Sequence, residues 1–120
     1  MDIFKRRSRL LISICLLIAA SAAVAHHGWS GYDSDKPLTL TGIIKDSGYE
    51  HPHGFIKLQI KDKLWRAVLA PPGRMESRGL AREALKPGNE ATVMGYPHRT
   101  DANEMRAERI TVAGKTVELR

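Results

Sequence analysis

The sequence predicts an all-β fold, a small OB-fold-like barrel of five to six strands with one short helix, preceded by a signal peptide. Short segments of alternating apolar and polar or β-branched residues, separated by clusters of Gly, Pro, Asn and Asp, indicate the strands. A segment of helix-forming residues lies between the third and fourth of them, where an OB-fold has its helix. An SH3-like barrel also has five short strands, and the position of this helix favours the OB-fold.

Residues 1–25 have the three parts of a signal peptide. A basic cluster precedes an apolar stretch over residues 10–20, and small residues follow over 21–25. The small residues predict cleavage before His26, and a second register would cut before Val24. Because a membrane-spanning helix needs about 20 strongly apolar residues, we expect cleavage rather than a retained anchor. The mature protein would then be periplasmic.

Charge and cysteine usage narrow the function classes. The chain carries 19 Lys and Arg against 13 Asp and Glu, a formal net charge of +6. Four of the basic residues and one of the acidic ones lie in residues 1–25, so the 95 residues that follow carry only +3. We therefore expect no nucleic-acid partner. Cys15 lies in the signal peptide, so the mature chain can form neither disulfides nor thiolate ligands.

The first half of the predicted barrel holds three strands. Leu38–Asp46 is rich in Thr, Ile and Leu, and Gly42 within it marks a bulge or a close backbone approach. Phe55–Lys61 alternates apolar and polar residues, and Leu64–Leu69 continues the pattern after a two-residue turn. The last two strands form a hairpin, with Trp65 facing the core.

The second half holds the helical segment and the remaining strands. Arg74–Leu85 carries helix formers, and Gly79 within it indicates one or two short helices. The strands predicted after it are Glu90–Tyr96, Met105–Val112 and Thr116–Leu119. A change in the apolar alternation within the longest of them, between Ala107 and Ile110, predicts a β-bulge. Residues 26–37 precede the barrel as an extended segment, and the barrel domain spans 38–120.

All five histidines lie in the mature chain and outside the predicted strands. Imidazole is the commonest protein ligand for copper and zinc. In an OB-fold we expect the loops over 47–54 and 97–103 to lie at one side of the same face, which would bring three histidines to one rim. The candidate metal ligands are His26, His27, His51, His53 and His98.

Cleavage before His26 would create a second kind of site. The α-amine and the ring Nδ1 of this residue could then chelate one Cu(II) ion, which favours tetragonal sets of nitrogen ligands. Cleavage before Val24 would place His26 third in the chain. An N-terminal segment with His at its third position also chelates copper and nickel. Copper is therefore the expected metal.

A set of short motifs spread over the mature chain resembles a known family. The motifs are His26-His27-Gly28-Trp29-Ser30, Tyr32-Asp33, Thr41-Gly42, Pro52-His53, Trp65, Arg78-Gly79-Leu80, Leu85-Lys86-Pro87-Gly88, Gly95-Tyr96-Pro97 and Met105-Arg106-Ala107-Glu108. The family consists of small exported bacterial proteins catalogued as a domain of unknown function. The resemblance implies a periplasmic β-barrel and no catalytic residues. The family commonly has Asn where this chain has His51, which leaves His53 the stronger candidate ligand.

Together these observations predict an exported, non-catalytic, monomeric binding protein. In the first hypothesis it binds copper or another divalent metal through its N-terminal and loop histidines. In the alternative it is a metal-free OB-like interaction module that binds a protein partner or a small ligand through the same rim. Neither a nucleophile motif nor a glycine-rich phosphate loop is present.

Overall fold

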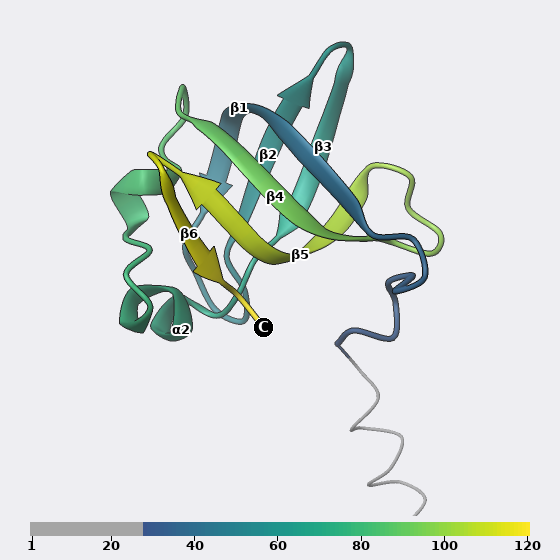
Figure 1. Cartoon of the computed structure of the whole chain (residues 1–120), viewed down its shortest axis with the longest axis horizontal. Helices are drawn as coiled ribbons and strands as arrows, with labels where there is room; N and C mark the ends of the chain where they lie inside the picture. Colours follow the sequence, from purple (N-terminus) through teal and green to yellow (C-terminus); the bar gives the residue numbers. More distant parts are fainter. Residues whose placement is uncertain (1–27) are drawn as a thin grey trace, which may run out of the picture. The chain divides into compact units, whose positions relative to one another are not determined.

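The computed structural model describes residues 28–120, of which residues 28–31 form a turn and Tyr32–Arg120 form one compact unit. The predicted signal peptide over 1–25 and the histidines His26 and His27 lie outside the described residues. Figure 1 shows the elements of the compact unit. They are β1 (Leu38–Gly48), β2 (Phe55–Ile60), β3 (Lys63–Val68), α2 (Pro72–Ser77), the 3-10 helix η1 (Arg82–Leu85), β4 (Glu90–Pro97), β5 (Glu104–Val112) and β6 (Lys115–Glu118).

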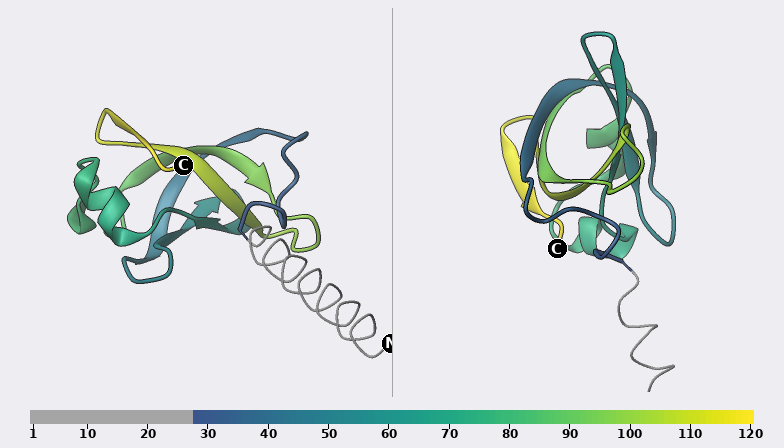
Figure 2. Two further views of the ribbon diagram at one scale, coloured as in Figure 1. Left: turned by 90° about the horizontal axis from the view of Figure 1, so that it is seen from below. Right: turned by 90° about the vertical axis from the view of Figure 1, so that its right-hand side faces the viewer.

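The strands form a closed barrel. They are hydrogen-bonded in the order β3-β2-β1-β4-β5-β6, and β3 also pairs with β5 in parallel, which closes a ring of five strands (Figure 2, right). Every other pairing is antiparallel, and β6 extends the sheet beyond β5. This topology confirms the predicted OB-fold-like barrel, with its helical segment between β3 and β4.

Both predicted irregularities are present, and β1 contains a further bulge. The partner of Met94 is Arg109 and that of Gly95 is Ala107, so Glu108 is the extra residue of a bulge within the predicted interval. In β1 the bulge lies at Lys45, because the register shifts between Ile44 and Asp46. Gly42 instead marks a close approach, since a Cβ there would lie 2.5 Å from the carbonyl oxygen of Gln59.

Apolar side chains from all the strands fill the barrel, and the helical segment closes one end. Met75 of α2 and Leu85 of η1 are both buried in this core. The inward side chains of β2 are buried as the alternation predicts. Trp65 is only partly buried against the core, and the Lys63 ammonium lies 3.6 Å from the centre of its ring. No helix among residues 28–120 has the length and apolar character to cross a membrane.

We predict that the bulge in β5 requires glycine at position 95. A Cβ at Gly95 would overlap the carbonyl oxygen of Arg106 and lie 2.8 Å from the Cα of Ala107, both of them backbone atoms. Gly95→Ala should therefore lower the free energy of unfolding by about 2 kcal/mol or more. Gly73 of α2 is the matched control, since nothing lies within 4 Å of a Cβ there. Gly73→Ala should leave stability unchanged or raise it by about 1 kcal/mol. Urea unfolding would show this contrast, and equal effects of the two changes would contradict it.

Candidate functional site

The loops that carry three of the candidate histidines lie at opposite ends of β1. Strands β1 and β4 are antiparallel, with Leu38 paired with Gly95 and Ile43 with Glu90. The loop after β4 therefore lies beside the start of β1, whereas the loop after β1 begins 11 residues along that strand. In Figure 1 the second of these ends is also the end at which α2 and η1 lie. His51 is exposed in its loop, whereas His53 and His98 are connected across the closed barrel through the side chains of Arg106 and Tyr32.

His53 is bonded to a buried arginine. A guanidinium nitrogen of Arg106 donates to the ring Nε2 of His53 over 3.1 Å, so this nitrogen carries a lone pair and not a proton. Burial, followed by the positive charges of Arg106 and Arg74, lowers the pKa of His53 below its ordinary value of 6.5. Since Arg106 is 8% exposed, its charge is poorly screened by water. A metal cation at Nε2 would have to displace this guanidinium.

The two ring nitrogens of His98 have different partners from those of His53. Its Nδ1 accepts the backbone N–H groups of Asp101, over 2.9 Å, and Thr100, over 3.2 Å. The proton of a neutral ring therefore lies on Nε2, which is 3.9 Å from a carboxylate oxygen of Glu104. This arrangement orders the loop after β4. It leaves no lone pair on either ring nitrogen free for a metal.

Tyr32 links the two histidines through a network of side chains at this side of the barrel. Its hydroxyl donates to Glu104 over 2.8 Å, and its ring meets that of His98 edge-on, with centroids 5.2 Å apart. The ring also lies 6.0 Å from the guanidinium of Arg106. Burial and the carboxylate of Glu104 raise the pKa of Tyr32 to about 12. Tyr32 also forms a β-bridge with His98, so it pins the start of the compact unit to the end of β4.

The described residues do not assemble a metal site by themselves. Residues 28–120 contain no group of three or more His, Cys, Asp or Glu side chains placed to hold one ion. The donor chemistry agrees, because Nε2 of His53 and Nδ1 of His98 already accept hydrogen bonds inside the protein. Of the remaining candidates, His51 is exposed in its loop, and His26 and His27 lie outside the described part of the chain.

The outward side chains of β1, β2 and β3 form a second candidate, which we call the outer face. Register places Ile43, Gln59 and Leu64 in one row across the three strands. Ile43 is 37% exposed and Leu64 is 42% exposed, and they are the exposed large hydrophobic residues among those that the structure describes. In the next outward row Lys57 pairs with Arg66, and the row continues to Asp46 on β1 and Glu104 on β5. This face therefore joins an apolar row to a charged row.

An aromatic ring lies beyond the charged row of the outer face. The ring of Phe55 lies against Gly48, where a Cβ would overlap it. The guanidinium of Arg66 is 4.3 Å from the centre of this ring and 3.8 Å from a carboxylate oxygen of Glu104. The surface thus offers apolar, aromatic and cationic groups in fixed positions, which suits non-covalent binding. Sequence reasoning missed it, although the neighbouring Leu64 and Trp65 signal that one large apolar side chain of β3 must face outward.

We predict that the charge of Arg106 adds to burial in lowering the pKa of His53. In the native protein this pKa should lie below 6.5, and Arg106→Gln should raise it because a positive neighbour is removed. Arg74→Gln should raise it less, and the control Arg66→Gln should leave it unchanged. Since the unfolded chain takes up the proton first, stability should fall as the pH drops below 6.5. NMR titration of the ring proton would measure these values, and a native pKa at or above 6.5 would be inconsistent with the contact.

Similar solved structures agree with the fold. A chain of the S. pombe Stn1–Ten1 complex has a TM-score of 0.52 and 15% sequence identity, and the match covers 66% of this chain and 59% of that one. A chain of a complex of TiaS with an isoleucine tRNA and ATP has a TM-score of 0.49 and 17% identity, and the match covers 74% of this chain and 20% of that one. This chain therefore spans less than two thirds of either one. The likeness to the Stn1–Ten1 chain concerns the fold alone.

Sequence comparison gives the family. A search of curated proteins found no match. The model of one protein family, described as a family of unknown function, matches residues 14–106. This match spans the strands β1 to β4, the helical segment and the start of β5. It agrees with the resemblance to a domain of unknown function that the sequence motifs indicate. The chain belongs to this family, DUF6152.

Proposed function

We propose that the protein is an exported, non-catalytic binding module that contacts a protein partner through its outer face. The observation that carries this proposal is the row of Ile43, Gln59 and Leu64. Ile43 and Leu64 flank Gln59 in this row. Exposure of large apolar side chains to water is unfavourable, and a partner that covers them lowers the free energy. Strands 2 and 3 are also the surface at which OB-folds bind their ligands.

The charged row of the outer face suits a partner that also carries charged groups. In this row Asp46 pairs with Lys57, and Arg66 is oriented by the ring of Phe55 and by Glu104. An oriented guanidinium loses less side-chain entropy when it binds a carboxylate. The surface of a folded protein carries apolar and charged groups close together. A protein partner could therefore contact both rows of the outer face.

Export follows in this proposal from the N-terminal sequence. The basic cluster, the apolar stretch and the small residues over 21–25 have the order of a cleaved signal peptide. The mature protein would begin at His26 in the periplasm.

A second candidate function is the binding of Cu(II) at the new N-terminus, and it is compatible with the first. The observation in its favour is the position of His26 and His27 directly after the small residues that end the signal peptide. Because His53 and His98 are engaged within the barrel, we assign the metal to the α-amine and ring of His26, with His27 and His51 as further ligands. The barrel would then present a metal-bearing N-terminal segment.

The outer face can be tested by photo-crosslinking in living cells. A photoreactive residue at position 64 or 59 should yield adducts with one partner protein, because these positions lie in the apolar row. The control is position 39 on β1. It is also exposed and faces outward, but it is paired with β4 and not with β2. Ile43→Ser should reduce the adducts from position 64 severalfold, since it removes one of the two large apolar contacts. An equal yield from position 39, or no adducts at 64 and 59, would contradict the proposal.

The copper site can be tested on protein purified after expression of the full chain. Its intact mass should correspond to a chain that begins at His26, and Cu(II) should bind one to one with a visible d–d absorption band. One Ala inserted before His26 should weaken binding at least about tenfold, because the terminal amine leaves the chelate. His53→Ala and His98→Ala are the controls and should leave the affinity unchanged. Binding that ignores the inserted Ala but depends on His53 would favour the loop histidines instead.

A further inference from the structure

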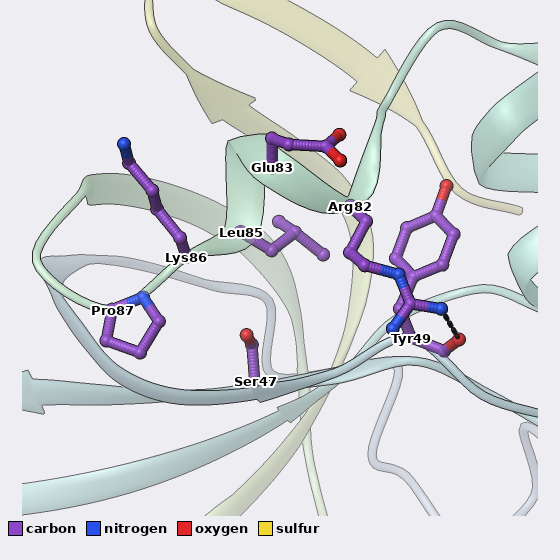
Figure 3. Close-up of a pocket in the computed structure, with 7 residues that line it drawn as sticks. All are labelled: Ser47, Tyr49, Arg82, Glu83, Leu85, Lys86 and Pro87. Carbon is purple, nitrogen blue, oxygen red and sulfur yellow. Dashed lines mark hydrogen bonds between the residues drawn. The ribbon is translucent and has the colours of Figure 1, made fainter.

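A cleft of about 340 Å³ lies between the end of β1 and the 3-10 helix η1. In Figure 3 the Lys86 ammonium lies on the side opposite the Arg82 guanidinium. The Glu83 carboxylate is turned away from the Ser47 hydroxyl, and Leu85 is 1% exposed. These groups do not converge on one ligand. The outer face is the stronger candidate surface, because its groups lie side by side in one row.

The apolar row of the outer face has a polar side chain at its centre. Gln59 of β2 is paired with Ile43 of β1 on one side and with Leu64 of β3 on the other. Paired residues of antiparallel strands point to the same face of a sheet, so the amide of Gln59 lies between the two exposed apolar side chains. Neighbouring strands are about 4.8 Å apart, which separates these two side chains by roughly 10 Å. A partner that covers both of them also covers the amide.

A hydrogen bond fixes the orientation of this amide. A nitrogen of the Gln59 side chain donates to the carbonyl oxygen of Lys61 over 2.6 Å. Because a carbonyl oxygen can only accept, the amide atom that faces it is Nε2 and not Oε1. Lys61 belongs to the two-residue turn between β2 and β3. The oxygen Oε1 of Gln59 therefore points away from the carbonyl group of this turn.

The amide oxygen of Gln59 is available to a partner. Within residues 28–120, no group donates a hydrogen bond to this Oε1. The side chain is partly exposed, so water can hydrate the oxygen until a partner covers the apolar row. An amide oxygen that loses water without gaining a donor opposes binding, and this loss is comparable with the gain from covering one large apolar side chain. The partner therefore needs a donor at this point.

The surroundings of Gln59 select the kind of donor. A Lys or Arg side chain of the partner would have to bring a charge out of water, which is costly. A Ser or Thr hydroxyl would leave most of the apolar row uncovered. Phenol and indole groups combine a large apolar ring with one neutral O–H or N–H donor, and they are enriched in protein interfaces. One such ring can lie across Gln59, contact both apolar neighbours and donate from its edge.

We infer that Gln59 determines the specificity of the outer face by accepting a hydrogen bond from a Tyr or Trp side chain of the protein partner. The ring of that residue lies between Ile43 and Leu64, and its O–H or N–H donates to Oε1 of Gln59. This inference rests on the proposed function, because it names the contact by which that partner is recognised. Unlike a purely apolar contact, this contact should be weakened by a larger apolar side chain at position 59.

Photo-crosslinking from position 64 of the full chain tests this inference. Gln59→Leu enlarges the apolar surface but removes the acceptor, and it should reduce the adduct yield at least about fivefold. Gln59→Glu keeps an oxygen acceptor and should retain a higher yield than Gln59→Leu. The matched control Thr39→Leu is also a change from a polar residue to Leu at an outward position, and it should leave the yield unchanged. Amide NMR spectra of the purified variants would verify that each barrel is folded.

A double substitution tests the donor. Mass spectrometry of the adduct from position 64 locates the partner segment that contacts the apolar row, and this segment should contain a Tyr or a Trp. Replacement of that residue by Phe removes the donor and keeps an aromatic ring. The replacement should reduce the adduct yield at least about fivefold with native Gln59, and less than about twofold with Gln59→Leu.

The outcomes separate this inference from the proposed function. An absence of adducts at positions 64 and 59 of the native protein contradicts the proposed function, and this inference with it. If native adducts form, three results overturn the inference alone. The first is a yield from Gln59→Leu that equals or exceeds the native yield, or the yield from Gln59→Glu. The second is a crosslinked segment with neither Tyr nor Trp, and the third is that the effects of the two substitutions are additive.

Discussion

The parallel pairing of β3 with β5 is the contact on which the remaining structure depends. Three residue pairs form it, and they are Arg66 with Glu104, Ala67 with Met105 and Val68 with Arg106. The central pair faces inward and is buried, so this seam completes the core. The two outer pairs face outward and bring charged groups from distant parts of the chain together. Without the seam, β2 and β3 would be a hairpin at the edge of an open sheet, with unpaired backbone groups.

The same seam explains why the loop histidines serve the fold. Arg106 points outward at the seam, where His53 and the ring of Tyr32 cover it. A buried guanidinium is costly unless acceptors and an aromatic face surround it, and a neutral imidazole supplies an acceptor without adding charge. His98 performs a related task, because its ring accepts the N–H groups of its own loop. Histidines that stabilise the barrel in this way are poor metal ligands, which directs the copper proposal to the N-terminus.

Local patterns were enough to predict the strands, the helical segment and the OB-like order, because alternation and turn residues are encoded within short windows. The network around Arg106 could not be predicted in this way. His53 and Arg106 are 53 residues apart, and Tyr32 and Glu104 are 72 apart. Their meeting depends on how the barrel closes. The placement of the loop histidines also depends on closure. The pairing of β1 and β4 places the two loops at opposite ends of β1, and the seam between β3 and β5 brings His53 and His98 to the same network.

The bulge at Lys45 changes which residues of β1 face outward. Before it, Ile43 faces outward and Ile44 inward, and strict alternation would direct Ser47 outward as well. The extra residue reverses the alternation, so Asp46 pairs with Lys57 on the outside and Ser47 pairs with Ile56 on the inner side. One strand therefore contributes Ile43 to the apolar row and Asp46 to the charged row of the outer face, while Ser47 faces inward.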